Sequence, residues 1–144
     1  MFTIEGKDKK GRPILWYRPE LLKKSEPPQQ RQRNKQLIIY FTEKLDKQYP
    51  NEGWVIASDA SKINRENVDM DFYLFGVKVF MVYYLRSFKN LFGMSIPSAL
   101  DDLVKIALDA MDDELRNRLK FIKFKELTDN YIDAKNVPSY FAKT

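Results

Sequence analysis

The sequence contains no cysteine and no histidine. Without cysteine, the chain has no disulfide framework and no thiolate ligand for a metal ion. Without histidine, it also lacks the usual base of a serine or cysteine nucleophile and the ligands of most zinc sites. We therefore expect no metal, no cofactor and no enzymatic activity.

Other functional signals are scarce. Only five glycines occur, and none forms the glycine-rich phosphate loop of nucleotide-binding proteins. No apolar run approaches the roughly 20 residues that cross a bilayer. The start of the chain lacks the pattern of a cleaved signal peptide. A length of 144 residues suits one domain, residues 1–144, and the absences together favour a cytoplasmic protein.

Three acidic residues, Asp59, Asp69 and Asp71, allow two interpretations. They could form a cluster for a hard metal ion. Alternatively, Asp69 caps a helix and Asp71 lies in its first turn, where carboxylates stabilise free backbone N–H groups. The second interpretation is favoured, because capping residues are common at helix starts.

The net charge of +5 is concentrated near the N-terminus. Residues 1–35 hold ten basic and four acidic side chains, whereas the rest of the chain is nearly balanced. A solvated surface, an anionic-membrane patch and a nucleic-acid patch are all consistent with this excess. No nucleic-acid-binding motif supports the third, so we expect no nucleic acid partner. The candidate contacts to a peripheral membrane surface are Lys7, Lys9, Lys10, Arg12, Lys23 and Lys24.

Hydrophobic patterning predicts alternating strands and helices. The expected strands are residues 2–4, 13–17, 54–58, 91–95 and 119–124. The expected helices are residues 34–48, 69–88, 98–115 and 126–133, with a loop over residues 20–33. Helical segments between consecutive strands imply parallel pairing and right-handed crossovers. The sequence therefore predicts an α/β fold.

Six short segments, in order along the chain, resemble the CRAL-TRIO lipid-binding domain. Residues 7–16 resemble its opening strand with a D-x-x-G-R-P signature, and residues 54–59 a core strand that ends in Asp. The remaining likenesses are at residues 82–91, 95–97, 120–122 and 137–141. The chain is identified on these segments as a relative of that family.

The resemblance implies a mixed, mostly parallel sheet with helices packed around it and an apolar cavity. The cavity would hold a phospholipid or another hydrophobic ligand for transfer or presentation at membranes. The helix after residues 95–97 would be a mobile gate. Periodicity alone indicates only a face packed on the sheet. The implied gate residues are Leu100, Leu103, Val104, Ala107, Leu108 and Met111. The implied floor residues are Leu15, Tyr17, Val55, Ala57, Phe92, Met94 and Phe121.

The chain also departs from the family pattern. It begins almost at the first strand, so we expect the small helical lobe that usually precedes the domain to be absent. Leu85 replaces a proline, and Ala142-Lys143 replaces a closing Gly-Gly. Tyr140 stands where a basic residue is common, which counts against a phosphoinositide ligand. The alternative is a cavity-less module for protein interaction or membrane adaptation, whose protein partner the sequence does not name.

Overall fold

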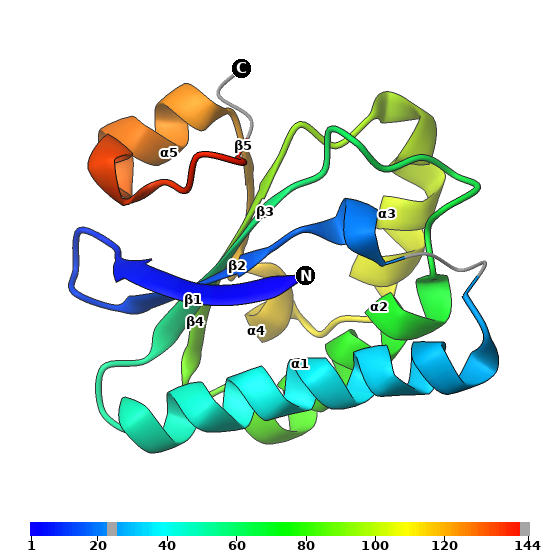
Figure 1. Ribbon diagram of the computed structural model, residues 1–144, viewed down its shortest axis with the longest axis horizontal. Coiled ribbons are helices and arrows are strands. Elements are labelled where there is room, and N and C mark those ends of the chain that lie inside the picture. The colour runs from blue at the N-terminus through cyan, green and yellow to red at the C-terminus, as the bar shows by residue number, and fades with distance from the viewer. Residues whose placement is uncertain (23–25, 142–144) are drawn as a thin grey trace.

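The computed structural model describes residues 1–22 and 26–141 (Figure 1). Within them lies a five-stranded sheet with the order β1-β2-β3-β4-β5. The strands are β1 (Phe2–Lys7), β2 (Pro13–Tyr17), β3 (Trp54–Asp59), β4 (Phe88–Met94) and β5 (Leu119–Ile122). β1 is antiparallel to β2, and the other neighbouring strands are parallel. The predicted mixed, mostly parallel sheet is confirmed.

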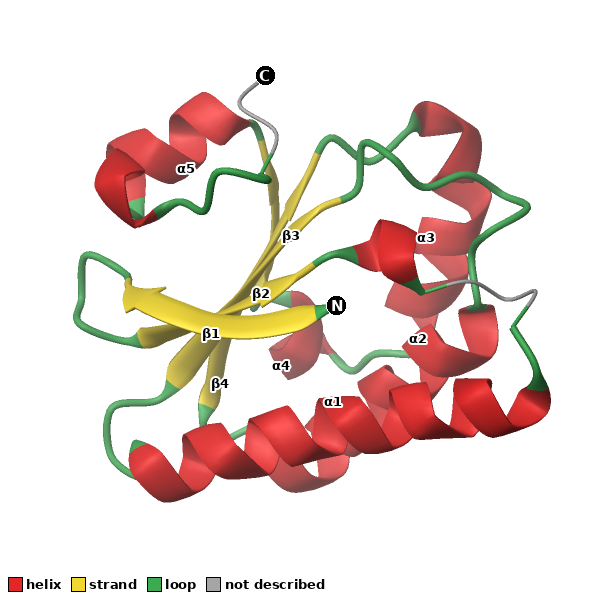
Figure 2. Cartoon of the chain, viewed as in Figure 1, coloured by secondary structure: helices red, strands yellow, loops and turns green. Residues whose placement is uncertain are grey.

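The helices alternate with these strands, as Figure 2 shows. The α-helices are α1 (Pro28–Gln48), α2 (Met70–Val79), α3 (Asp101–Asp109), α4 (Asp113–Arg116) and α5 (Phe124–Asn130). A π-helical turn, η2 (Phe80–Tyr84), continues α2. Short 3₁₀ turns lie at η1 (Pro19–Leu21), η3 (Ser98–Leu100) and η4 (Ala134–Asn136).

The strand order decides which face each helix covers. The strands follow one another across the sheet in chain order, so right-handed crossovers all fall on one face. We call this face, which α1 to α4 cover, the crossover face. The opposite face is covered by α5 and residues 132–141, and we call it the α5 face (Figure 1). Each face has its own apolar core.

Several element boundaries differ from the predicted ones. α1 begins at Pro28 rather than at residue 34, because a proline in the first helical turn needs no hydrogen-bond acceptor for its nitrogen. The predicted helix 98–115 is divided: α3 ends at Asp109, and the Asp112 carboxylate starts α4 by accepting the Leu115 N–H at 2.9 Å.

The turn between β1 and β2 explains the Asp-x-x-Gly-Arg signature. The buried Asp8 carboxylate accepts hydrogen bonds from the backbone N–H groups of Lys10 (2.9 Å) and Arg12 (2.8 Å). It also accepts one from the Arg12 guanidinium at 2.7 Å. Gly11 adopts a φ of +78°, which residues with a side chain rarely adopt. The signature therefore shapes the turn.

Candidate functional site

The crossover face is hollow. An apolar cavity of about 230 Å³ lies among the sheet, α2 and α3. Its floor comes from alternate residues of the strands: Tyr17, Ile56, Leu91, Gly93, Leu119 and Phe121. Its α2 wall includes Met70, Phe72, Tyr73, Gly76, Val77 and, in the π-helical turn, Phe80. The site can hold an apolar group, whereas burying a charged group there would be strongly unfavourable.

All six predicted gate residues line this cavity. Leu100, in the turn before α3, is buried, whereas no residue within α3 itself is buried. Leu103, Val104, Ala107 and Leu108 are half-buried against the cavity. Ile106, on the outer side of α3, is 50% exposed. A helix that buries none of its residues fully is held to the domain by few contacts, as a movable element requires.

The predicted floor residues divide between the two faces of the sheet. Tyr17 and Phe121 line the cavity. Leu15 lies on the same face, fully buried in the core beside it. The prediction was wrong for the other four, which lie in the core of the α5 face: Val55, Ala57, Phe92 and Met94.

The correction has a physical cause in the pleat of the sheet. Successive side chains of a strand point to opposite faces, so an error of one residue reverses every assignment. In β4 a bulge adds a second uncertainty, because the pairing shifts between Trp54–Phe88 and Val55–Asn90. Beyond the bulge, Leu91 and Gly93 face the cavity.

The α2 wall was not among the predicted site residues. The signal was present in the sequence, since the segment 69–88 is apolar on several sides. Such a helix is buried on several sides. Phe72, Val77 and Phe80 are both buried in the core and part of the cavity wall.

Among the described residues that line the cavity, Tyr17 and Tyr73 are the two whose side chains carry a polar group. The Tyr17 and Tyr73 hydroxyl oxygens lie 3.1 Å apart and share a hydrogen bond. Burial raises the pKa of both phenols, that of Tyr73 to about 12, and the nearby Asp69 and Glu20 carboxylates raise them further. Both hydroxyls are therefore protonated at neutral pH.

Asp69 and Asp71 stabilise the start of α2. The Asp69 carboxylate accepts the Phe72 N–H and pairs with Arg31 of α1 at 2.8 Å; Asp71 pairs with Arg31 at 3.3 Å. Burial opposes ionisation of Asp69, but the hydrogen bonds from Arg31 and Phe72 outweigh it and lower its pKa. The capping interpretation is confirmed. Within residues 1–22 and 26–141, no group of three or more acidic side chains is placed to hold a metal ion.

An ion pair holds the N-terminal end of α3. The Arg65 guanidinium, in the β3–α2 connection, donates to the Ala99 carbonyl oxygen at 2.9 Å and pairs with Asp102. The hydrogen bond from Arg65 lowers the pKa of Asp102. Both side chains are more than half exposed, so the contact is accessible to water and salt.

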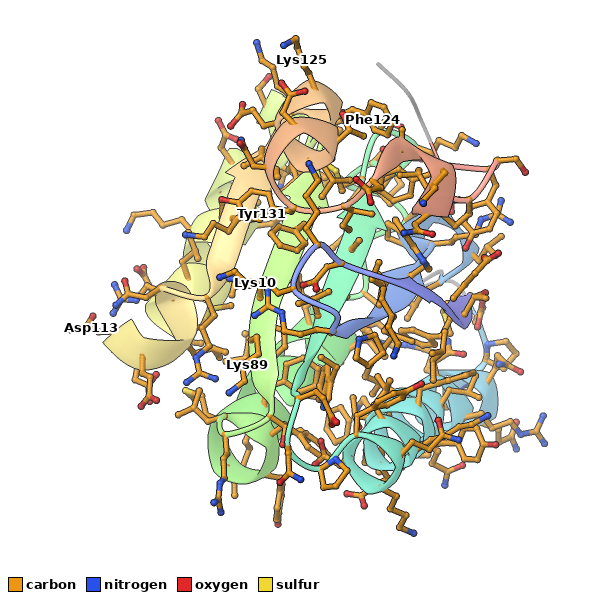
Figure 3. The ribbon with its side chains drawn as sticks, turned by 90° about the vertical axis from the view of Figure 1, so that its left-hand side faces the viewer. Lys10, Lys89, Asp113, Phe124, Lys125 and Tyr131 are labelled. Carbon is orange, nitrogen blue, oxygen red and sulfur yellow. The ribbon has the colours of Figure 1, made fainter. Side chains whose placement is uncertain are left out.

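The predicted membrane contacts lie at the other end of the molecule. Lys7 ends β1, and Lys9, Lys10 and Arg12 lie in the β1–β2 turn, at the left in Figure 1, whereas α3 lies at the right. Figure 3 looks onto this turn, where Lys10 lies beside Tyr131. The turn is fixed to α5, since the Lys9 N–H donates to the Tyr131 carbonyl at 2.8 Å. Lys23 and Lys24 lie outside the described residues.

Comparisons with known proteins agree with this architecture. The crystal structure of Sfh5 matches with a TM-score of 0.67 at 11% sequence identity, over 90% of this chain. The match spans 50% of the Sfh5 chain, so the protein is similar to about half of that structure. Among the described residues, no helix combines the length and apolarity needed to cross a membrane. A family model for the CRAL/TRIO domain matches residues 1–142, and the chain belongs to the CRAL/TRIO domain family.

Proposed function

We propose that residues 1–144 form one CRAL-TRIO-like domain that binds a hydrophobic ligand in the cavity and exchanges it when α3 moves. The cavity lining carries this proposal, because the side chains that form it are apolar except those of Tyr17 and Tyr73. Burying one CH₂ group of a ligand there is worth about 0.8 kcal/mol. An apolar lining suits binding, so we propose a carrier rather than an enzyme.

A phospholipid, the ligand suggested by the resemblance, requires more room than the cavity offers with α3 in its present position. A volume of about 230 Å³ is below the range of roughly 300–1,000 Å³ common for ligand pockets. Phospholipid transfer would therefore involve an open state in which the gate helix moves outward. The weak burial of α3 and its exposed ion pair support such a movement.

The first experiment is native mass spectrometry of the protein purified from cells, followed by loading from liposomes. A bound hydrophobic mass, or lipid taken up from liposomes, is expected. A protein that is empty after purification and takes nothing from liposomes would contradict the proposal. The cavity-less interaction module would then be the better hypothesis, although the cavity counts against it.

Two substitutions in α3 give a matched pair for the gate. Val104→Asp places a carboxylate against the cavity and should reduce ligand loading at least tenfold, because an unpaired buried charge is strongly unfavourable. Ile106→Asp makes the same change on the exposed side of the same helix and should leave loading nearly unchanged. Equal effects of the two would refute the gate.

For membranes, we propose that the β1–β2 turn supplies a peripheral, electrostatic contact. The loading experiment also tests this, when run with anionic liposomes at low and high salt, since salt screens exposed charges. Within the family, the Asp69–Phe72 helix start and the Tyr83–Tyr84 pair resemble the CRAL-TRIO portion of motile sperm domain-containing protein 2. We propose a kinship with that protein on this likeness alone.

A further inference from the structure

The sheet has an open edge at β1, which pairs with β2 on one side only. In an antiparallel ladder, hydrogen-bonded and non-bonded residue pairs alternate. The Met1 carbonyl accepts the Arg18 N–H at 2.9 Å, which fixes this alternation. The N–H and C=O groups of Phe2 and Ile4 therefore point away from β2. Within residues 1–22 and 26–141, these four backbone groups have no hydrogen-bond partner.

One end of β1 carries the features that usually block an exposed edge, which are charges and bulges. The pairing with β2 shifts at a bulge between Ile4 and Lys7, and Glu5 and Lys7 are charged. The Asn136 side-chain amide also donates to the Lys7 carbonyl at 3.2 Å. Residues 2–4 have neither a charge nor a bulge. This half of β1 is therefore open to a further strand.

Exposed apolar side chains of α1 lie beside the open half. β1 and α1 run side by side in Figure 1. The centroid of the Phe2 ring lies 5.7 Å from that of Phe41, which lies 5.2 Å from the Tyr40 ring. Tyr40 is 58% exposed, and Leu37, one turn earlier in α1, is 37% exposed. Adjoining exposed apolar residues mark interaction sites, and tyrosine is enriched where partners bind.

Basic residues flank these side chains. One face of α1 carries four residues at helical spacing, which we call the α1 stripe: Arg33, Leu37, Tyr40 and Lys44. The two acids of α1 lie on another face. The Glu43 carboxylate accepts the Tyr84 hydroxyl at 2.6 Å, and the Asp46 carboxylate accepts the Trp54 indole N–H at 2.7 Å. The stripe therefore has an apolar centre between two positive charges.

We propose that β1 is a docking edge for an extended segment of a partner protein, apolar at alternate positions and acidic at its ends. The backbone of the segment pairs with Phe2 and Ile4 as an added strand, and its apolar side chains lie on the α1 stripe. Its acidic ends meet Arg33 and Lys44, which sets their register. This inference goes beyond the proposed function and does not depend on the cavity.

A second copy of this chain and an anionic membrane suit the edge less well. Two copies joined at β1 would bring the same basic stripe to both sides of the contact, where like charges repel. A membrane surface attracts the basic residues but offers no row of donors and acceptors spaced like those of a strand. An acidic strand satisfies both the free backbone groups and the charges.

The probe is the synthetic peptide Asp-Val-Thr-Val-Thr-Val-Asp with a fluorescent label, and its binding is measured by anisotropy. Paired residues of neighbouring strands point to the same face, so the valines that lie on α1 also turn their N–H groups towards β1. A form with N-methylated valines and a form with Lys in place of Asp should each bind at least tenfold more weakly. If the parent peptide binds no better than these two forms, the proposal is wrong.

Amide hydrogen exchange, followed by NMR, tests the mode of binding. The free N–H groups of Phe2 and Ile4 should exchange at least tenfold more slowly when the parent peptide is bound. The Thr3 N–H already faces β2, so its exchange should change little. A peptide that binds without slowing exchange at Phe2 and Ile4 does not add to the sheet, and the docking edge is refuted.

Two exposed tyrosines give a matched pair of variants. Tyr40→Asp should weaken binding of the parent peptide at least tenfold, because it places a negative charge in the α1 stripe. Tyr83→Asp makes the same change in η2, where the side chain is 72% exposed, and should leave binding unchanged. Equal effects of the two variants would contradict the proposal. Thermal unfolding checks that both are folded.

Other occupants of the edge give different results. Dimers that Tyr40→Asp dissociates, seen by sedimentation, would identify a second copy and overturn the proposal. Loss of binding to anionic liposomes in Tyr40→Asp, with peptide binding unchanged, would identify a membrane and overturn it as well. Ligand loading of Tyr40→Asp should be normal, since Tyr40 does not line the cavity. The docking edge and the cavity can therefore fail independently.

Discussion

The two faces of the sheet carry similar apolar residues but are packed differently. On the α5 face, Trp16, Val55, Ala57 and Phe92 are fully buried beneath Leu127 and Ile132. On the crossover face, more helices cover the sheet, and yet the space under α3 is open. The number of apolar residues on a face therefore does not decide whether its core is fully packed. The position of the covering helix relative to the sheet does.

The largest contrast is expected from the same substitution on each face. Leu127→Ala removes a fully buried side chain of α5 and should lower the free energy of unfolding by about 2–5 kcal/mol. Leu103→Ala removes a half-buried side chain of α3 beside space that is already empty. It should cost about 1 kcal/mol or less, since fewer contacts are lost.

Urea unfolding of the two variants measures this contrast. The second measurement is ligand loading. There the variant with the smaller loss of stability, Leu103→Ala, should show the larger effect. Leu103→Ala changes the cavity wall and should alter loading, whereas folded Leu127→Ala should load normally. Similar losses of stability for both variants would mean that the crossover face is as tightly packed as the α5 face.

A smaller effect of opposite sign is expected at Gly76. This glycine lies in α2, lines the cavity, and a Cβ atom added to it would meet no atom within 4 Å. Gly76→Ala should stabilise the protein by about 0.5–1 kcal/mol through helix propensity alone. Gly76→Leu should in addition fill part of the cavity and reduce loading.

The pair of variants separates these two contributions. Thermal unfolding should show a gain for both, and loading should fall only for the leucine. Gly93 is the contrasting glycine, since an added Cβ would approach the Phe121 ring to 3.1 Å. A loss of stability in Gly76→Ala would contradict the open space next to α2.

The smallest effect on stability is expected from the ion pair at the start of α3. Arg65→Ala should leave the unfolding free energy nearly unchanged, because exposed pairs contribute little. It should nevertheless speed ligand release, measured by stopped-flow exchange. The pKa of Asp102 is lowered by Arg65, so the contact is fully present at neutral pH and is lost as the pH falls below the usual value of 3.8.

Release from the unmodified protein should then accelerate at acidic pH and at high salt. The Arg65→Ala variant is the control. Because it lacks the contact with Asp102, its release rate should not change with pH or salt through that contact. An unmodified protein whose release rate is the same at pH 7 and below pH 3.8 would show that the Arg65 contact does not restrain α3.

The sequence predicted the fold well where periodicity and chain order agree. Continuous apolar runs gave the strands, and alternation with helices gave the parallel pairing. The six residues predicted to form the gate all line the cavity, as expected for one apolar face of a helix. Boundaries were less predictable, since Asp112 ends one helical segment and caps the next through a local hydrogen bond.

The cavity floor was the part that sequence reasoning could not determine. In strands buried on both faces, such as β3, the run from Trp54 to Ala57 is apolar throughout, so no polar residue within it marks which side faces outward. The bulge after Phe88 then reverses the alternation in β4. The Tyr17–Tyr73 contact joins residues 56 positions apart and depends on the tertiary structure.

The strand order also bears on how the protein is made. Since β1 to β5 follow one another across the sheet, each strand can pair with its predecessor as the chain leaves the ribosome. The helices of the crossover face are synthesised between the strands, but α5 and residues 132–141 follow after all five strands. Until they emerge, Trp16, Val55 and Phe92 are exposed to water. Chaperones that bind apolar surface are therefore expected to bind the nascent chain on the α5 face, which is fully packed in the finished protein.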